Sequence, residues 1–319
     1  MTQNIEALGL RVRKWIVPRL PVLSRVGRFG FLSLLLGVIA YQVLRDWQKI
    51  RDYPWRLNWA NILEAFFLYT ISLALTALVW ALIMRGLSGT GSLFTHLRLY
   101  CLSNPARRLP TPVWYIGVRA VAYQELEVPR TITVTASIIE MVVTNLGALT
   151  TALVTLSFGL FAQKLPRIGW ALVVLFPLAV LMLKPALLID LVNLGLRKLK
   201  RTKIVAQIRR VDMLRWVGIF VLIFLNGGVL LYIAVSTIYP LPPRMLPAMI
   251  NAFSISWLAS WLGQMLFFLP NTAIRQVTLA YLLSFYMPWP VAIASTLLLR
   301  IAVIMFEMFW ALIFARLKP

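Results

Sequence analysis

The sequence predicts an all-α membrane protein with several spanning helices. Of its 319 residues, 61% are hydrophobic and only 13% are charged, whereas a soluble domain carries about 25% charged residues. Several apolar runs approach or exceed the roughly 20 residues that an α-helix needs to cross a bilayer. Because the hydrocarbon core offers no hydrogen-bond partner to an open sheet edge, these two observations together predict the helical class.

Six apolar stretches are predicted to span the membrane. A basic leader, residues 1–28, precedes them, and residues 29–316 are expected to form one integral membrane domain. Within that domain, a basic connector over residues 193–215 separates two halves of the chain. The predicted spans are residues 29–44, 61–84, 131–162, 168–189, 216–239 and 289–310.

Two further stretches are predicted to be helical hairpins that are broken at proline. In each, one proline separates two apolar arms, and a second proline begins a long helix. The second arm of each hairpin extends roughly 24 Å at 1.5 Å per residue, which is short of a hydrocarbon core of about 30 Å and favours re-entry over crossing. We interpret the two stretches, about residues 93–160 and 247–315, as an internal repeat. The prolines are Pro110 and Pro129 in the first unit and Pro270 and Pro288 in the second.

The basic residues predict that the protein lies in the cytoplasmic membrane with both termini in the cytoplasm. If each hairpin returns to its own side, 22 of the 32 lysines and arginines are cytoplasmic and 8 are outside. This bias follows the positive-inside rule. In the same topology the first unit enters from the cytoplasm and the second from outside. The repeats are therefore predicted to be inverted, as in many secondary transporters.

Composition and motifs also limit the functions open to the chain. The net charge of +22 comes from basic residues in short loops beside apolar segments, which indicates anionic lipid headgroups rather than nucleic acid as partners. The single Cys101 and the single His96 predict neither a disulfide framework nor a metal site, and we expect no cofactor. No catalytic motif is found, so we expect no enzyme. An intramembrane enzyme would need two acid–base groups within hydrogen-bond reach in one cavity.

Charged residues inside apolar stretches mark the candidate binding site. Glu140 shares one helix face with Ser137 and Thr144. A substrate or proton-coupling site and a structural pairing with another helix both explain this face. Arg300 holds nearly the equivalent position in the second unit, so Glu140 and Arg300 are predicted to pair across the pseudo-twofold axis. A local network between Arg300 and Glu307 is the alternative.

Arginines that flank the proline breaks complete the candidate site. Arg119 and Arg275 lie near helix N-termini, which favour anions. Because a guanidinium matches the geometry of phosphate, both are predicted to receive a lipid phosphate, with Gln276 beside them. For each arginine the alternative is a side chain that extends to the membrane interface. Arg107 and Arg108 are expected to anchor to headgroups at that interface.

The two units also carry motifs of a known family. The first contains Asn104-Pro105-Ala106-Arg107-Arg108-Leu109-Pro110, Gly117, Arg119, Pro129 and Glu140, and the second contains Ser256-Trp257, Gly263, Pro270, Arg275-Gln276, Pro288 and Arg300. In these residues the chain resembles the transmembrane domain of the lysylphosphatidylglycerol synthase/flippase family, over nearly its whole length. It departs from that family at Gln276, where a glycine-rich turn ending in glutamate is usual.

The resemblance implies that the chain binds or moves a phospholipid or a lipid-linked substrate. It does not imply aminoacyl transfer, which belongs to a separate soluble domain in that family. The alternative is a non-transporting partner or scaffold for an enzyme that builds envelope lipids or glycans. The two hypotheses differ in geometry, because a transporter needs its buried charges to converge in one cavity. The residues concerned are Arg119, Glu140, Arg275 and Arg300.

Overall fold

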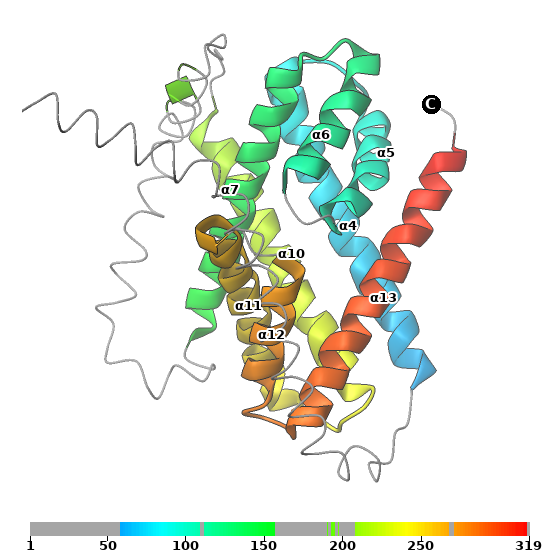
Figure 1. Cartoon of the computed structure of the whole chain (residues 1–319), viewed down its shortest axis with the longest axis vertical. Coiled ribbons are helices and arrows are strands. Elements are labelled where there is room, and N and C mark those ends of the chain that lie inside the picture. The colour runs from blue at the N-terminus through cyan, green and yellow to red at the C-terminus, as the bar shows by residue number, and fades with distance from the viewer. Residues whose placement is uncertain are drawn as a thin grey trace, which may run out of the picture. The chain divides into compact units, whose positions relative to one another are not determined.

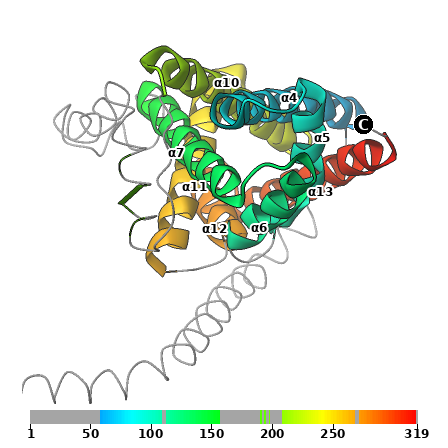
Figure 2. The same ribbon diagram turned by 90° about the horizontal axis from the view of Figure 1, so that it is seen from above.

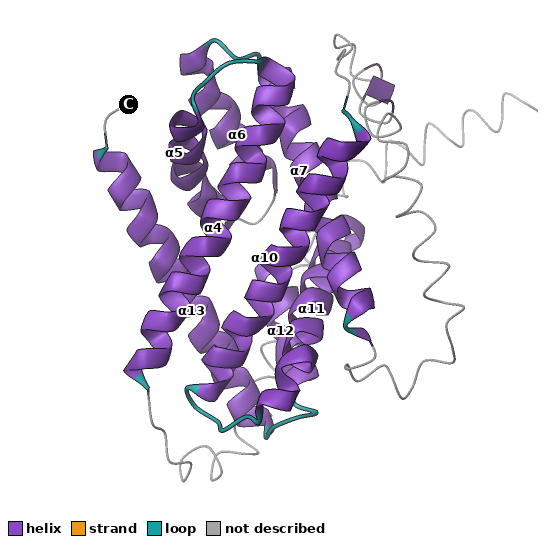
Figure 3. Cartoon of the chain, turned by 180° about the vertical axis from the view of Figure 1, so that it is seen from behind, coloured by secondary structure: helices purple, strands orange, loops and turns teal. Residues whose placement is uncertain are grey.

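The computed structural model describes residues 58–108, 112–156, 190, 193–194, 197, 208–267 and 271–317, which belong to one compact unit, Trp55–Pro319. All regular structure among these residues is helical, and none of them forms a strand (Figure 3). The all-α prediction is therefore confirmed for the described part of the chain. The predicted leader, the spans over residues 29–44 and 168–189, and most of the connector lie outside it.

Five described segments are long and apolar enough to cross a membrane, as expected of a multi-pass membrane protein. Four of them match predicted spans. The fifth was predicted as the first arm of the second hairpin and not as a span, but its helix, which begins at Leu246, is long enough to span. The helices are α4 (Trp59–Ser88), α7 (Arg130–Val154), α10 (Arg210–Ser236), α11 (Leu246–Phe267) and α13 (Trp289–Arg316).

The first broken unit is built from short helices that lead into α7. The Ser92 hydroxyl caps the first of them by accepting a 3.1 Å hydrogen bond from the Thr95 backbone N–H, as is typical at a helix start. The unit contains α5 (Leu93–Ser103), the 3₁₀ turn η1 (Asn104–Arg108), α6 (Pro112–Ala122), the 3₁₀ turn η2 (Tyr123–Leu126) and then α7.

The second broken unit has a similar design. A short 3₁₀ turn, η5 (Pro243–Met245), leads into α11, which is followed by α12 (Asn271–Leu283) and α13. In both units a proline caps the long helix with nearly the same backbone, φ −57° and ψ 137° at Pro129 and φ −55° and ψ 139° at Pro288. Proline suits this position because its ring fixes φ and because no helical N–H is lost there.

The two hairpins lie toward opposite ends of the helical bundle. The turn that joins α6 to α7 is at the upper end in Figure 1, and the turn that joins α12 to α13 is at the lower end. The long helices run between these ends, and in Figure 2 they are seen around a common centre. This arrangement brings residues of both units to the middle of the bundle.

Close helix packing around α10 joins α11 of the second unit to α4. Gly227 and Gly228 of α10 lie against Phe253 and Ile250 of α11, where an added Cβ atom would overlap a side chain or the backbone. Small residues permit such close approach of helices in membranes. On the other side of α10, the Asn226 amide donates 2.6 Å and 2.7 Å hydrogen bonds to the Leu68 carbonyl and the Ser72 hydroxyl of α4.

Candidate functional site

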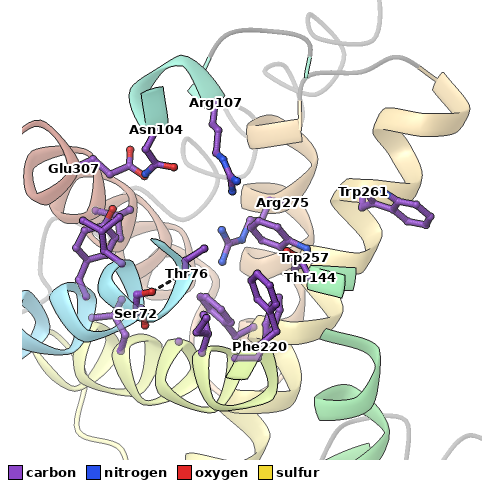
Figure 4. A pocket seen from close by; sticks show the side chains of 18 of the residues that line it. Ser72, Thr76, Asn104, Arg107, Thr144, Phe220, Trp257, Trp261, Arg275 and Glu307 are labelled. Atoms are coloured by element: carbon purple, nitrogen blue, oxygen red, sulfur yellow. Dashed lines mark hydrogen bonds between the residues drawn. The ribbon is translucent and has the colours of Figure 1, made fainter. Parts of the chain in front are cut away.

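A cavity of about 280 Å³ lies between the two broken units, α4 and α10. Its wall combines aromatic side chains with charged and amide side chains, and Figure 4 shows it from close by. Six of the residues singled out from the sequence line it. They are Glu140, Thr144, Arg275, Gln276, Arg300 and Glu307.

Glu140 is the centre of a buried cluster in the first unit. Its side chain is only 1% exposed. Arg119 Nη1 donates to Glu140 Oε2 at 2.5 Å, and Arg107 Nη2 donates to Oε1 at 2.5 Å. The Tyr100 hydroxyl adds a 3.2 Å hydrogen bond to Oε1. Both oxygens of the carboxylate therefore accept hydrogen bonds from guanidinium groups.

Arg119 lies behind this carboxylate and away from the cavity. The side chain is fully buried, so the alternative in which it extends to the membrane interface is wrong. Its guanidinium carbon is 4.1 Å from the Trp80 ring centre and 4.5 Å from that of Tyr100, and its Nε donates to the Ser103 hydroxyl at 3.1 Å. Arg119 therefore positions Glu140, and we do not assign it to direct contact with a ligand.

Arg107 takes the place in the cavity that was expected of Arg119. Sequence reasoning put Arg107 at the interface, but its side chain is 26% exposed and lines the cavity. Its guanidinium carbon lies 4.9 Å from the ring centre of Tyr115. Arg108 ends η1, and its side chain lies outside the described part of the structure.

The predicted pairing of Glu140 with Arg300 is wrong. Both oxygens of Glu140 accept from the arginines of its own unit, and no described residue forms an ion pair with Arg300. A signal in the sequence favoured the observed pair, because Arg119 and Glu140 lie at nearly equal distances on either side of Pro129. Residues placed in this way on two neighbouring antiparallel helices face each other.

The second unit contributes two half-buried arginines to the cavity. Arg275 of α12 and Arg300 of α13 both line it. The Arg275 guanidinium carbon lies 4.6 Å from the ring centre of Phe253 and 5.1 Å from that of Trp257, so the cation is held on an aromatic wall. In Figure 4 the side chains of Arg107 and Arg275 both project into the cavity, one from each unit.

Glu307 joins α13 to the first unit. Its Oε1 accepts a 3.1 Å hydrogen bond from the Asn104 amide of η1, and both residues line the cavity (Figure 4). This contact replaces the local network with Arg300 that was considered from the sequence. It links the two broken units directly at the wall of the cavity.

The polar face of α7 is largely satisfied within the helix. The Ser137 hydroxyl donates to the Thr133 carbonyl at 2.9 Å, and the Thr144 hydroxyl donates to the Glu140 carbonyl at 2.7 Å. Thr144 lines the cavity, whereas Ser137 is fully buried and does not. Of the predicted polar face, Glu140 and Thr144 therefore face the cavity.

A hydrogen-bond chain that was not predicted supports the cluster from behind. The Trp80 indole N–H donates to the Tyr123 hydroxyl at 2.8 Å, and that hydroxyl lies 2.8 Å from His96 Nδ1. His96 Nε2 lies 3.0 Å from the Thr90 carbonyl. Every hydrogen bond of this chain forms when His96 is neutral and carries its proton on Nε2. Burial lowers the pKa of His96, which also favours the neutral form.

Comparisons with family models and with curated protein sequences found no relative of this chain. The resemblance to the lysylphosphatidylglycerol synthase/flippase family therefore stays a prediction.

Proposed function

We propose that this protein is a flippase-like transporter of the cytoplasmic membrane, with a cavity that receives the anionic headgroup of a phospholipid or lipid-linked substrate. The observation that carries the proposal is the cavity between the two broken units. Arg107, Arg275 and Arg300 reach it from three different helical segments. A guanidinium at membrane depth is costly unless it meets an anion or lines a polar cavity.

The chemistry of these side chains suits a phosphate group. Arginine presents a planar fork of N–H donors that can bind two phosphate oxygens at once. Arg107 uses one nitrogen on Glu140, while its Nε–H has no acceptor among the described residues. Arg275 rests on the aromatic rings of Phe253 and Trp257 and lines the same cavity. A phosphodiester in the cavity would accept from the Nε–H of Arg107.

We further propose that the two units are inverted repeats that alternate in opening the cavity to the two sides of the membrane. Support comes from the matching proline caps at Pro129 and Pro288 and from the opposite ends at which the hairpin turns lie (Figure 1). In known transporters of this design, the substrate site lies between the repeats near the middle of the bilayer. The Asn104–Glu307 hydrogen bond joins the units and would have to break when they move apart.

Convergence of the charges favours a transporter over a scaffold. A scaffold for an envelope-lipid or glycan enzyme has no need of a shared cavity, whereas three of the four residues expected to converge, Glu140, Arg275 and Arg300, line one cavity. The fourth, Arg119, lies behind Glu140 and does not line it. That the protein is not an enzyme stays a prediction. Tyr100 and Glu140 are within hydrogen-bond reach at 3.2 Å, but a carboxylate bound by two guanidinium groups is a poor proton acceptor.

The test is a lipid-movement assay in liposomes that contain the purified full chain. Fluorescent phosphatidylglycerol is placed in both leaflets, and the fraction accessible to a membrane-impermeant quencher is followed with time. Movement is expected with the wild type and with Arg215→Ala, which removes an exposed arginine of α10, and at least a tenfold slower rate is expected with Arg275→Ala. Folded wild-type protein that moves no lipid would overturn the proposal and favour the scaffold.

A further inference from the structure

The formal charge of the cavity limits which headgroups it can accept. Three arginines and two glutamates line it, and Arg119 completes the cluster from behind Glu140. Four cations therefore face two anions among the described residues, which leaves a formal excess of two positive charges. In a site of low dielectric constant such an excess attracts an anion and repels a cation much more strongly than it would in water.

The excess comes from one position in the second unit. Arg275 and Arg300 lie on either side of Pro288 much as Arg119 and Glu140 lie on either side of Pro129. In the first unit the partner of Arg119 is the carboxylate of Glu140. At the corresponding position the second unit has Arg300. Both arginines of the second unit line the cavity, so their charge is directed to whatever occupies it.

Neutral polar groups also line the cavity. The Trp257 indole N–H, the Asn145 amide oxygen and the Gln276 amide oxygen are buried and have no hydrogen-bond partner among the described residues. One is a donor and two are acceptors. A buried polar group without a partner costs free energy, so an occupant that supplies both donors and acceptors is favoured. Hydroxyl groups do both.

We infer that the cavity takes an anionic phosphodiester lipid whose headgroup carries hydroxyls, such as a glycerol- or sugar-phosphate, and that it rejects aminoacylated headgroups with a net positive charge. The inference rests on the proposed function and names the substrate class of the same site. Arg107, Arg275 and Arg300 bind the phosphate. The amides of Asn145 and Gln276 and the indole of Trp257 select the hydroxyls. An aminoacyl group would bring an ammonium ion into a cavity that already holds excess positive charge.

Binding of short-chain lipids to the purified full chain tests this inference without any need for transport. Dioctanoyl phosphatidylglycerol is titrated calorimetrically against dioctanoyl phosphatidylpropanol, which has the same charge and nearly the same size but lacks both hydroxyls. Lysyl-phosphatidylglycerol and free glycerol phosphate are titrated in parallel. Phosphatidylglycerol is expected to bind about tenfold more tightly than phosphatidylpropanol, the ratio expected when about 1.4 kcal/mol of hydrogen bonding is lost, and lysyl-phosphatidylglycerol is expected not to bind.

The variant Gln276→Met removes one neutral acceptor and leaves the charges unchanged. It is expected to reduce the preference for phosphatidylglycerol over phosphatidylpropanol severalfold while phosphatidylpropanol still binds, with an unfolding midpoint close to that of the wild type. Retention of phosphatidylpropanol binding shows that the variant is folded.

The results that overturn the inference differ from those that overturn the proposed function. Equal affinity for phosphatidylglycerol and phosphatidylpropanol, or tight binding of lysyl-phosphatidylglycerol, overturns the inference and leaves a lipid-binding cavity in place. Free glycerol phosphate that binds as tightly as the lipid overturns both, because the ligand is then a soluble anion. Absence of binding by every lipid also overturns both.

Discussion

In the first broken unit Arg119 of α6 faces Glu140 of α7, and in the second unit Arg275 of α12 and Arg300 of α13 hold the corresponding places. The first pair is buried and closed, with aromatic rings around the guanidinium. The second pair lines the cavity. The two units therefore share a backbone design but differ in charge: Arg119 is paired with a carboxylate of its own unit, whereas two arginines of the second unit line the cavity.

Among the variants that test this comparison, we expect the largest loss of stability for Glu140→Gln. The variant removes the counter-ion of the buried Arg119 and of the half-buried Arg107, and loss of one partner from a buried ion pair costs about 3–5 kcal/mol. We expect the thermal unfolding midpoint of the purified protein to fall strongly. Glu125→Gln, which makes the same chemical change at an exposed carboxylate, is expected to have almost no effect. Equal stability of the two variants would show that Glu140 is not structural.

Replacing Arg119 or Arg275 by lysine distinguishes a structural arginine of the first unit from a cavity-lining arginine of the second. Arg119→Lys loses the hydrogen bond to Ser103 and the planar contact with Trp80, and hydrogen bonds of charged groups contribute about 1.5–3 kcal/mol each. Arg275→Lys keeps the charge of the cavity and loses part of the contact with the aromatic wall, a contact worth about 0.5–1 kcal/mol. We expect unfolding measurements to rank Arg119→Lys as the less stable variant. The reverse ranking would contradict the division of roles.

Packing beneath Arg275 offers a smaller test that acts on the second unit alone. A methyl group at Gly227 would overlap the ring of Phe253, on which the Arg275 guanidinium rests. Gly227→Ala is expected to lower the free energy of unfolding by about 1–3 kcal/mol and to slow lipid movement. Gly218→Ala, on the same helix with open space at the new Cβ, is the matched control, and it is expected to be neutral or stabilising by up to about 1 kcal/mol.

The smallest effect is a pH dependence that belongs to the first unit. Burial lowers the pKa of His96 from its ordinary value of 6.5, so the folded state binds its proton less readily than the unfolded state does. The contribution of His96 to stability is therefore present above pH 6.5 and is lost as the pH falls below it. Unfolding midpoints measured from pH 7.5 to pH 5.5 are expected to fall for the wild type and to fall less for His96→Gln. Parallel curves would exclude His96 as the cause.

The helical class, the proline caps at Pro129 and Pro288 and four of the five charged residues that line the cavity could be predicted from the sequence. The predicted breaks at Pro110 and Pro270 lie outside the described residues. Apolar length and proline position are local properties, so α4, α7, α10 and α13 were found where hydropathy placed them. The spanning length of α11 was missed. The helix begins at Leu246 with Pro247 in its first turn, where proline is tolerated.

The interaction partners of the site residues were harder to predict than the residues themselves. Glu140 was identified, but its pairing with Arg107 depends on where η1 places Arg107 relative to α7, which no short-range pattern encodes. Symmetry between the repeats favoured Arg300 as the partner, whereas chain proximity across Pro129 selected Arg119. The Trp80–Tyr123–His96 chain joins residues from three separate segments. Its members have no common spacing that would connect them in the sequence.

The central claim is that a lipid headgroup enters the cavity between the two units. Photo-crosslinking in liposomes tests it most directly, with phosphatidylglycerol that carries a photoreactive group on its glycerol head and with the labelled peptides identified by mass spectrometry. We expect labelling on the cavity faces of α11 and α12, at Trp257 and Gln276 and their neighbours, and loss of this labelling in Arg275→Ala. Labelling confined to exposed residues of α13 such as Ile301 and Met305, and unchanged in the variant, would contradict the claim.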